Sequence, residues 1–388
     1  MELPFIKSLT RNYPQQRTFT HGSCNGLILM ENCTAKGSHI NLCVWNPTTK
    51  VYKEIGKKFK KDSTPVKYGY GLGYNCDTDD YKIVRANLVY GDDTNNNGWI
   101  CTGSRVQVYT LRSGLWKELP NIFPYNIYSY QDAFVNGALH WIALPCPGSA
   151  VELSSSLIVS FHIKGENFGE VPHPPHFNER FGFGPFGISL HVLGGCLCMV
   201  FSDPYNTEVW VMKDHKVRDS WTRLFIAKIP VEKTVKHFSM KLKWEFKNGK
   251  VLFEARSGDD AYFLIYDHYK SEVSKIYHIP EWRSSIETYV ESLVSIPGTS
   301  EGEQEYPSLR KQAVRPVQKN KKAARKYHLV EKVCITNDRE QHYIMPRKVT
   351  RKHMHKTCIS RDMMSVNQAD LPVLVKVLPR PNSYYDHV

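Results

Sequence analysis

Short runs of apolar residues, broken by glycine, asparagine and proline, recur along the chain from residue 20 to residue 297. Each repeat reads as a hairpin around a glycine turn, then a strand, a polar turn and a strand that ends near Trp or Pro. An aromatic residue recurs in the second half of each repeat, at spacings of 64, 52, 49 and 56 residues: Trp45, Tyr109, Phe161, Trp210 and Tyr266. The pattern predicts five units of about four strands, with room for one more assembled from both ends.

The first halves of the units carry a common turn signal. Asn-Gly between apolar strands favours a type I′ hairpin, because both central residues must take positive φ. The pairs in question are Asn25-Gly26, Asn136-Gly137, Gly194-Gly195 and Asn248-Gly249. We expect tight hairpins at all four.

Strands such as residues 261–266 are apolar at successive positions, which is typical of strands buried on both faces. Helical stretches long enough for a βαβ fold do not occur between them. The sequence therefore predicts an all-β fold, a β-propeller of four-stranded blades. Aromatic residues at repeated positions are expected to pack between blades: Trp45, Trp141, Trp210, Trp221 and Tyr266.

Charge divides the chain into a body and a tail. The formal net charge is +13, but residues 301–388 hold 18 Lys and Arg against 9 Asp and Glu, which leaves about +4 for the rest. We predict a short segment at 1–21, the propeller at 22–297 and a basic, mostly disordered tail at 298–388. Binding to nucleic acid is expected through the tail only, and such binding would weaken steeply with salt.

The sequence favours an intracellular location, in the cytoplasm, the nucleus or both. The first 20 residues have no apolar core of a secretory signal, and the uncharged run at 181–201 is interrupted by glycines, which argues against membrane insertion. The ten cysteines are dilute, and several lie in apolar strand-like runs, as small hydrophobic residues do in a reducing compartment.

Several motifs in a fixed order give the chain a family resemblance. They are the 21–28 segment His-Gly-Ser-Cys-Asn-Gly-Leu-Ile, Trp-Asn-Pro-Thr-Thr at 45–49, Gly-Leu-Gly-Tyr at 71–74, Asp-Tyr-Lys-Ile-Val-Arg at 80–85, Val-Asn-Gly-Ala-Leu-His-Trp at 135–141 and Tyr-Val-Glu-Ser-Leu at 289–293. In these residues the chain resembles the kelch-like F-box-associated domains of plant F-box proteins. The resemblance implies a module that captures a protein substrate, joined to an F-box that docks a Skp-type adaptor of a cullin-based ubiquitin ligase.

The start of the chain departs from that pattern. Residues 1–20 offer only Leu3, Phe5, Ile6 and Leu9 as apolar candidates, too few for the three packed helices of an F-box. We therefore expect the chain as written not to bind a Skp-type adaptor.

A search for catalytic chemistry favours a protein that is not an enzyme. No G-x-S-x-G, Walker loop or H-E-x-x-H appears, and no cofactor or metal is predicted. Asp77, Asp79 and Asp80 are interpreted as a solvated acidic turn, since the further ligands of a calcium loop are missing. The alternative is a kelch-propeller enzyme whose metal or acid residues converge on the axis from separate blades.

Binding residues are expected in the irregular segments between repeats, where aromatic, His and Arg side chains suit interface anchors. The candidate substrate-binding residues are Tyr125, Tyr128, Tyr130, His173, His176, Phe177, Arg180 and Tyr205.

Overall fold

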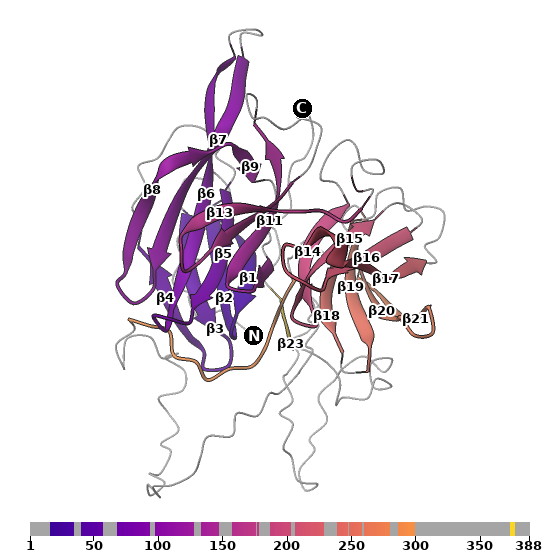
Figure 1. Cartoon of the computed structure of the whole chain (residues 1–388). Helices are drawn as coiled ribbons and strands as arrows, with labels where there is room; N and C mark the ends of the chain where they lie inside the picture. The colour runs from indigo at the N-terminus through magenta and orange to yellow at the C-terminus, as the bar shows by residue number, and fades with distance from the viewer. Residues whose placement is uncertain are drawn as a thin grey trace, which may run out of the picture.

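Five antiparallel sheets follow one another along the chain (Figure 1). The computed structural model describes residues 16–34, 40–56, 68–93, 98–127, 133–146, 157–175, 177, 187–202, 206–228, 239–246, 248–257, 260–279, 286–298 and 373–376. None of the helices within these residues is long and apolar enough to cross a membrane. The predicted tail, apart from Gly298 and residues 373–376, lies outside the described residues.

Each sheet is a blade whose strands pair in chain order. The first two blades comprise β1 (Gln16–Cys24), β2 (Leu27–Thr34), β3 (Ile40–Asn46) and β4 (Val51–Ile55), then β5 (Tyr68–Asn75), β6 (Asp80–Asp93), β7 (Gly98–Thr110) and β8 (Leu115–Phe123). The third comprises β10 (Ala133–Val135), β11 (Ala138–Pro145), β12 (Leu157–His162) and β13 (Asn167–Val171), with the short β9 (Tyr125–Ile127) paired to the far end of β11.

The last two blades have the same order. They comprise β14 (Ile188–Leu193), β15 (Cys196–Ser202), β16 (Asn206–Met212) and β17 (Trp221–Lys228), with the 3₁₀ helix η1 (Arg218–Ser220), then β18 (Ser239–Glu245), β19 (Lys250–Ser257), β20 (Asp260–Asp267) and β21 (Glu272–Ile279). A final strand, β22 (Ile286–Tyr289), pairs with β23 (Val373–Lys376).

The first strands of the blades form a ring. β5 contacts β1 and β10, β14 contacts β10 and β18, and β22 lies between β18 and β1. The prediction of an all-β propeller is confirmed, with five four-stranded blades and β22 closing the ring between the fifth and the first. β1 begins at Gln16, ahead of the start predicted at residue 22.

The repeated aromatic positions fall on the third strand of every blade, as the spacing predicted. Trp45, Phe161 and Tyr266 are at most 1% exposed, and Trp141 and Trp221 are buried as well. Trp210 differs: it is only partly buried, and its indole Nε1 donates to Glu208 at 3.0 Å at the edge of the core.

Four clusters of buried apolar side chains fill the spaces between successive blades, and each cluster is shared by two neighbouring blades. Between the first and second blades, Leu29 and Val44 pack against Tyr70 and Ile83. Each such side chain contributes roughly 1.5–3 kcal/mol when fully buried. Each blade is covered on both faces, so its strands need apolar residues at successive positions, and this is the pattern seen in the sequence.

The tight hairpins form at the predicted places, with one exception. Asn25, Asn136 and Gly194 all have positive φ, as do the glycines that follow them. In the fifth blade Gly249 has positive φ but Asn248 does not, and Phe246 N bonds to Lys250 O at 2.8 Å. That turn is a three-residue loop with glycine in the left-handed region, so the two-residue prediction is wrong there.

Residues 290–298 follow β22 as an extended segment that we call the strap. Figure 1 shows it running beneath the first blade. Asn46 Nδ2 donates to Ser292 O at 3.0 Å and to Val294 O at 2.8 Å, while Ile296 enters the core between the first two blades. The strap therefore ties the end of the propeller domain to its beginning.

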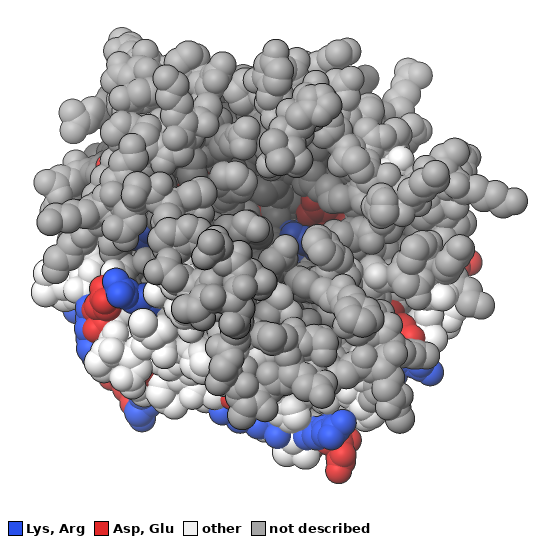
Figure 2. Space-filling model, turned by 90° about the horizontal axis from the view of Figure 1, so that it is seen from above, with Lys and Arg blue, Asp and Glu red and all other residues white. Residues whose placement is uncertain are grey.

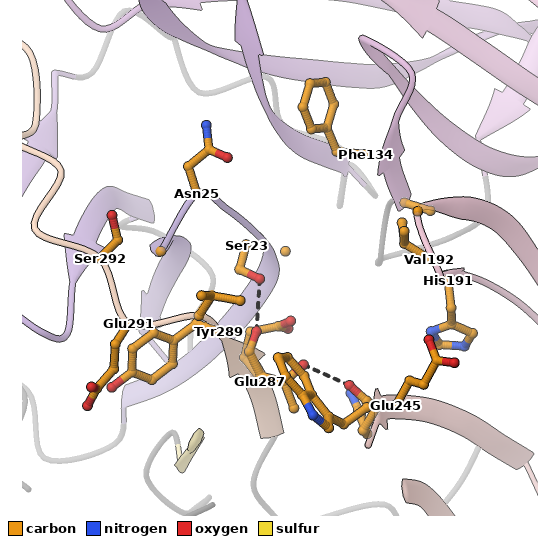
Figure 3. Close-up of a pocket in the computed structure, with 18 of the residues that line it drawn as sticks. Ser23, Asn25, Phe134, His191, Val192, Glu245, Glu287, Tyr289, Glu291 and Ser292 are labelled. Carbon is orange, nitrogen blue, oxygen red and sulfur yellow. Dashed lines mark hydrogen bonds between the residues drawn. The ribbon is translucent and has the colours of Figure 1, made fainter. Parts of the chain in front are cut away.

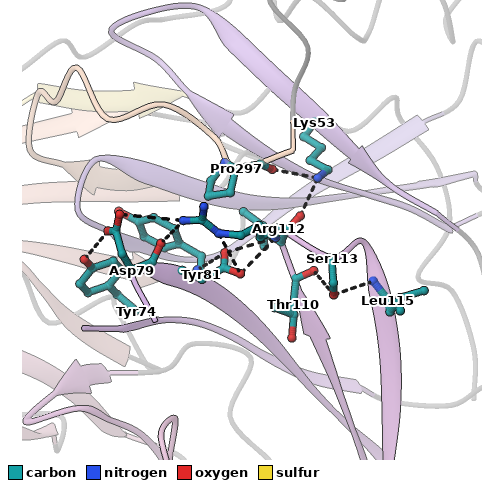
Figure 4. A network of polar contacts seen from close by, with 11 residues as sticks. Lys53, Tyr74, Asp79, Tyr81, Thr110, Arg112, Ser113, Leu115 and Pro297 are labelled. Atoms are coloured by element: carbon teal, nitrogen blue, oxygen red, sulfur yellow. Dashed lines mark hydrogen bonds and ion pairs between the residues drawn. The ribbon is translucent and has the colours of Figure 1, made fainter. Parts of the chain in front are cut away.

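A polar network continues this connection to the second blade (Figure 4). Lys53 Nζ donates to Pro297 O at 2.8 Å and to Leu111 O at 2.6 Å. Asp80 is 3% exposed and accepts from the Arg112 amide at 3.2 Å, which anchors the neighbouring turn. The interpretation of the acidic hairpin as solvated is wrong for Asp80, although Asp77 and Asp79 are exposed.

The two faces of the ring differ in their connections. The turns between first and second strands, and between third and fourth strands, lie on one face, which we call the short-turn face. The connections between blades leave from the opposite face, which we call the long-connection face, and the one from β13 to β14 spans residues 172–187. Figure 2 looks onto the long-connection face, and basic and acidic side chains lie side by side where described residues are visible at its edge.

Candidate functional site

Three of the eight sequence-predicted binding residues are described, and these three lie toward the long-connection face. Tyr125 stands at the start of β9, partly buried, and its hydroxyl donates to Glu170. Burial and this carboxylate raise the pKa of Tyr125 to about 12. Tyr125 therefore lies at the edge of the second and third blades with its hydroxyl already engaged.

His173 and Phe177 lie together in the connection between the third and fourth blades. Their rings stack at 4.5 Å with an interplanar angle of 13°. Phe177 is 5% exposed and packs near Phe201 in the core, whereas His173 is half-buried. Phe177 is therefore a core residue that packs under the ring of His173. The other candidates lie outside the described residues: Tyr128, Tyr130, His176, Arg180 and Tyr205.

A second candidate site lies on the axis of the ring, where the first strands of four blades and the strap enclose a cavity of ≈ 1600 Å³ (Figure 3). Its walls include Phe134 from the third blade, His191 from the fourth and Trp244 from the fifth. Turn residues Asn25 and Gly194 also line it, so the cavity reaches the short-turn face. Its volume exceeds the roughly 300–1,000 Å³ of typical small-molecule pockets.

The cavity has an excess of acidic side chains. Glu245, Glu287 and Glu291 line it, against one lysine, Lys243. Lys243 is buried and forms an ion pair with Glu254 at 3.3 Å. The net field at the cavity wall therefore favours a cationic group.

Burial shifts the titration of two of these groups. Desolvation raises the pKa of Glu287, opposed by the nearby charge of Lys243. Desolvation, with Lys243 and Lys241, holds the pKa of His191 well below its usual value. His191 is therefore neutral near pH 7 and adds no positive charge to the cavity.

Two polar atoms of the cavity-lining residues have no hydrogen-bond partner among the described residues. They are Glu287 Oε2, on a residue that is 9% exposed, and Trp244 Nε1, and solvent reaches neither atom. The Thr20 side chain and the Thr288 backbone hydrogen-bond to the Glu287 carboxylate and favour its charged form. Buried polar groups are nearly always paired, so each unpaired atom calls for an explanation. Within the described part of the chain, no three His, Cys, Asp or Glu side chains gather closely enough to hold a metal ion.

Sequence reasoning considered an axial site only in its alternative of a propeller enzyme, and it named none of these residues for such a site. Its residues come from strands up to about 270 positions apart, and a single Glu or Trp in a strand carries no linear motif. The one available signal was the repetition itself, because a ring of blades brings the first strand of every unit to the axis.

Comparison with known proteins places these features in a family. A family model described as the F-box associated beta propeller domain matches residues 3–296. In Arabidopsis thaliana, F-box protein CPR1 is 31% identical over 62% of this chain and 60% of its own length, and F-box protein At3g07870 is 30% identical over 60% and 57%. F-box/kelch-repeat protein At3g23880 is 29% identical over 52% and 51%. The chain thus spans about six tenths of the length of the first two relatives.

Among solved structures, the Malassezia sympodialis allergen Mala s 1 aligns with 71% of this chain and 86% of its own, at 12% identity and a TM-score of 0.39. A likeness at this level says nothing about function.

Proposed function

Because the chain belongs to the F-box associated β-propeller domain family, we propose that it is the substrate-recognition module of a cullin-based ubiquitin ligase. The observation that carries the proposal is the family match over residues 3–296, which coincides with a five-bladed ring. In this role the protein binds its target and performs no chemistry itself. A Skp-type adaptor and a cullin would act through an F-box joined to the domain.

The architecture supports a binding role. The blades are fixed to one another by apolar cores, and the strap closes the ring, so the surfaces on both faces are presented by a rigid scaffold. Preorganised surfaces bind with less loss of conformational entropy than flexible ones. We further propose that the protein works in the cytoplasm or nucleus, which a fluorescent fusion of the full chain would test.

The function can be tested with a chimera in which the full chain follows a competent F-box. Expressed in plant cells, the chimera should co-purify with the Skp-type adaptor and increase ubiquitin-modified lysines on a discrete set of proteins. The F-box alone is the control for adaptor binding. Ubiquitination of the same proteins by the chimera and by the F-box alone would refute the proposal.

A further inference from the structure

β22 occupies the position of the first strand in a sixth, incomplete blade. The first strands of the five blades contact one another around the ring, and β22 contacts β18 on one side and β1 on the other. β23 pairs with β22 in the antiparallel direction, as the second strand of every complete blade pairs with the first. Among the described strands this sheet has no third or fourth member. β22 and β23 therefore form half a blade.

The neighbouring blades anchor β22 from both sides. Ser23 Oγ on β1 donates to Thr288 O at 2.8 Å, and Thr288 Oγ1 donates to Lys243 O on β18 at 2.9 Å. The strap that continues from β22 is bonded to Asn46 of the first blade. These contacts do not involve β23, so the edge of β22 would keep its place and direction if β23 left. A strand edge fixed in advance loses little conformational entropy when it takes a partner.

β23 is held by fewer strand pairings than the second strand of any complete blade. Each of those second strands pairs on both sides, with the first and the third strand of its blade. Among the described strands β23 pairs with β22 alone, over the four residues from Val373 to Lys376. A two-stranded ladder of this length has little stability of its own. The pairing can therefore open while the complete blades stay folded.

The sequence of β23 shows what kind of segment this edge accepts. Residues 373–378 read Val-Leu-Val-Lys-Val-Leu, and Pro372 and Pro379 stand at the two ends of this run. Valine favours an extended backbone, and proline supplies no N–H for a ladder. The edge thus takes a short valine-rich segment in the antiparallel direction. Pairing of this kind draws its affinity from main-chain hydrogen bonds, so a segment from another protein can use the same edge.

The distance along the chain makes β23 a tethered occupant. Residues 290–372 separate β22 from β23, whereas tight turns join the first and second strands of the complete blades. A tether gives its segment an effective concentration on the order of 1 mM at most, which still exceeds that of a second copy of the chain in dilute solution. A different protein must therefore bind more strongly than β23 to replace it. Leu293, shortly after β22, is 79% exposed and offers such a partner an added apolar contact.

We propose that β22 is a docking edge for an extended segment of the protein substrate, which adds to it as an antiparallel strand, and that β23 is the chain's own competing occupant of this edge. That the segment belongs to a substrate rests on the proposed function. That the edge exchanges one strand for another does not, and the two can be measured separately.

The test uses the full chain and a fluorescein-labelled peptide of residues 371–379 as a model strand. Leu374→Pro together with Val375→Pro blocks β23, because successive N–H groups of a strand point to opposite edges and one of these two faces β22. Fluorescence anisotropy should give a dissociation constant on the order of 10–100 µM for this blocked variant. The unchanged chain should bind at least about tenfold more weakly, since its own β23 competes. Val366→Pro together with Asn367→Pro, outside β23, is the matched control and should bind as the unchanged chain does.

Hydrogen exchange assigns the binding to β22. In the blocked variant the peptide should slow amide exchange of residues 286–289 at least about tenfold and leave β19 unchanged. A peptide that carries proline at both substituted positions should neither bind nor protect. In the F-box chimera, the blocked variant should increase the ubiquitin-modified lysines on the target proteins, because the edge is no longer occupied.

Several results would overturn the proposal. Equal peptide affinity in the blocked and unchanged chains, or no binding up to about 1 mM, would exclude strand exchange at β22. Loss of folding in the blocked variant, seen by circular dichroism, would make β23 a structural strand of the ring. A dimer that only the unchanged chain forms would assign the edge to a second copy. If the peptide binds but both chimeras mark the same proteins equally, the edge does not receive the substrate. Should the peptide fail while the chimera still marks its targets, strand docking falls and the proposed function stands.

Discussion

Asn46 is expected to hold the ring closed, and its removal should destabilise the whole domain. The side chain is fully buried at the end of β3. Its Oδ1 accepts from Thr48 N at 2.9 Å and Thr49 N at 3.3 Å, which shapes the turn, while its Nδ2 donates to Ser292 O and Val294 O of the strap. One side chain thus joins the first blade to the last segment of the domain.

The size of the effect follows from these four hydrogen bonds. Each contributes about 0.5–1.5 kcal/mol net, and two strap carbonyls would lose their donor, so Asn46→Ala should cost about 2–6 kcal/mol. For a domain of this size each kcal/mol lowers the melting temperature by roughly 2–4 °C. Urea and thermal unfolding of the full chain measure both quantities.

Two further variants separate the turn from the strap. Asn46→Asp keeps the acceptor that the turn needs but sets a carboxylate oxygen against Ser292 O and Val294 O, so it should loosen the strap selectively. Asn75→Ala removes a single turn bond to Asp77 N at 3.1 Å, away from the strap, and should cost about 1 kcal/mol.

Hydrogen exchange of residues 290–298 supplies the local measurement. Exchange there should rise at least about tenfold in Asn46→Asp relative to Asn75→Ala, because the opening free energy of the strap falls. A loss below about 1 kcal/mol in Asn46→Ala, or equal strap exchange in the two variants, would refute the reasoning.

Three other predictions follow from burial and contact. Glu287→Gln should raise the free energy of unfolding at neutral pH and lose that advantage below about pH 4.5. The pKa of Glu287 is raised in the folded protein, so ionising this buried carboxylate destabilises the folded state as pH rises. A difference in unfolding free energy that stays constant from pH 4 to 8 would contradict this. Ile296→Ala, on a side chain that is 2% exposed, should cost about 2–5 kcal/mol in urea unfolding, whereas Leu293→Ala should cost under about 0.5; similar losses would show that the strap is not anchored through Ile296. Cys101 and Cys146 have sulfur atoms 3.6 Å apart, and the hydrogen bond with Cys146 lowers the pKa of Cys101 to about 7. Hydrogen peroxide should therefore oxidise the pair to a disulfide: the two thiols give up two electrons and two protons, and peroxide is reduced to water. Peptide mass spectrometry should find Cys101 joined to Cys146, and a disulfide of either residue with a different cysteine would contradict this.

The blades could be predicted from sequence because their causes are local. An apolar run at successive positions fixes a strand covered on both sides, and Asn25-Gly26 fixes a turn through backbone sterics alone. Repetition of these signals then gives the ring. In the fifth blade this local signal is not sufficient: Asn248-Gly249 is the same residue pair as Asn25-Gly26, but the loop is longer by one residue.

The strap and the cavity could not be predicted because their causes are distant. The strap is held largely through its main-chain carbonyls, at Ser292, Val294 and Pro297, and every residue has a carbonyl. Asp80 is buried for a related reason: the Arg112 amide from another hairpin of the same blade reaches it. Pairings of this kind depend on register and docking, which no local pattern records.

The strap gives the Trp-Asn-Pro-Thr-Thr motif at residues 45–49 a role beyond its turn. Strap residues 290–295 are held by Asn46, and they also form part of the cavity wall. Closing the ring and completing the cavity wall are therefore one event, since an open strap would remove residues 290–295 from that wall. This connection explains how an asparagine in the first blade contributes to a cavity whose wall continues beyond the fifth.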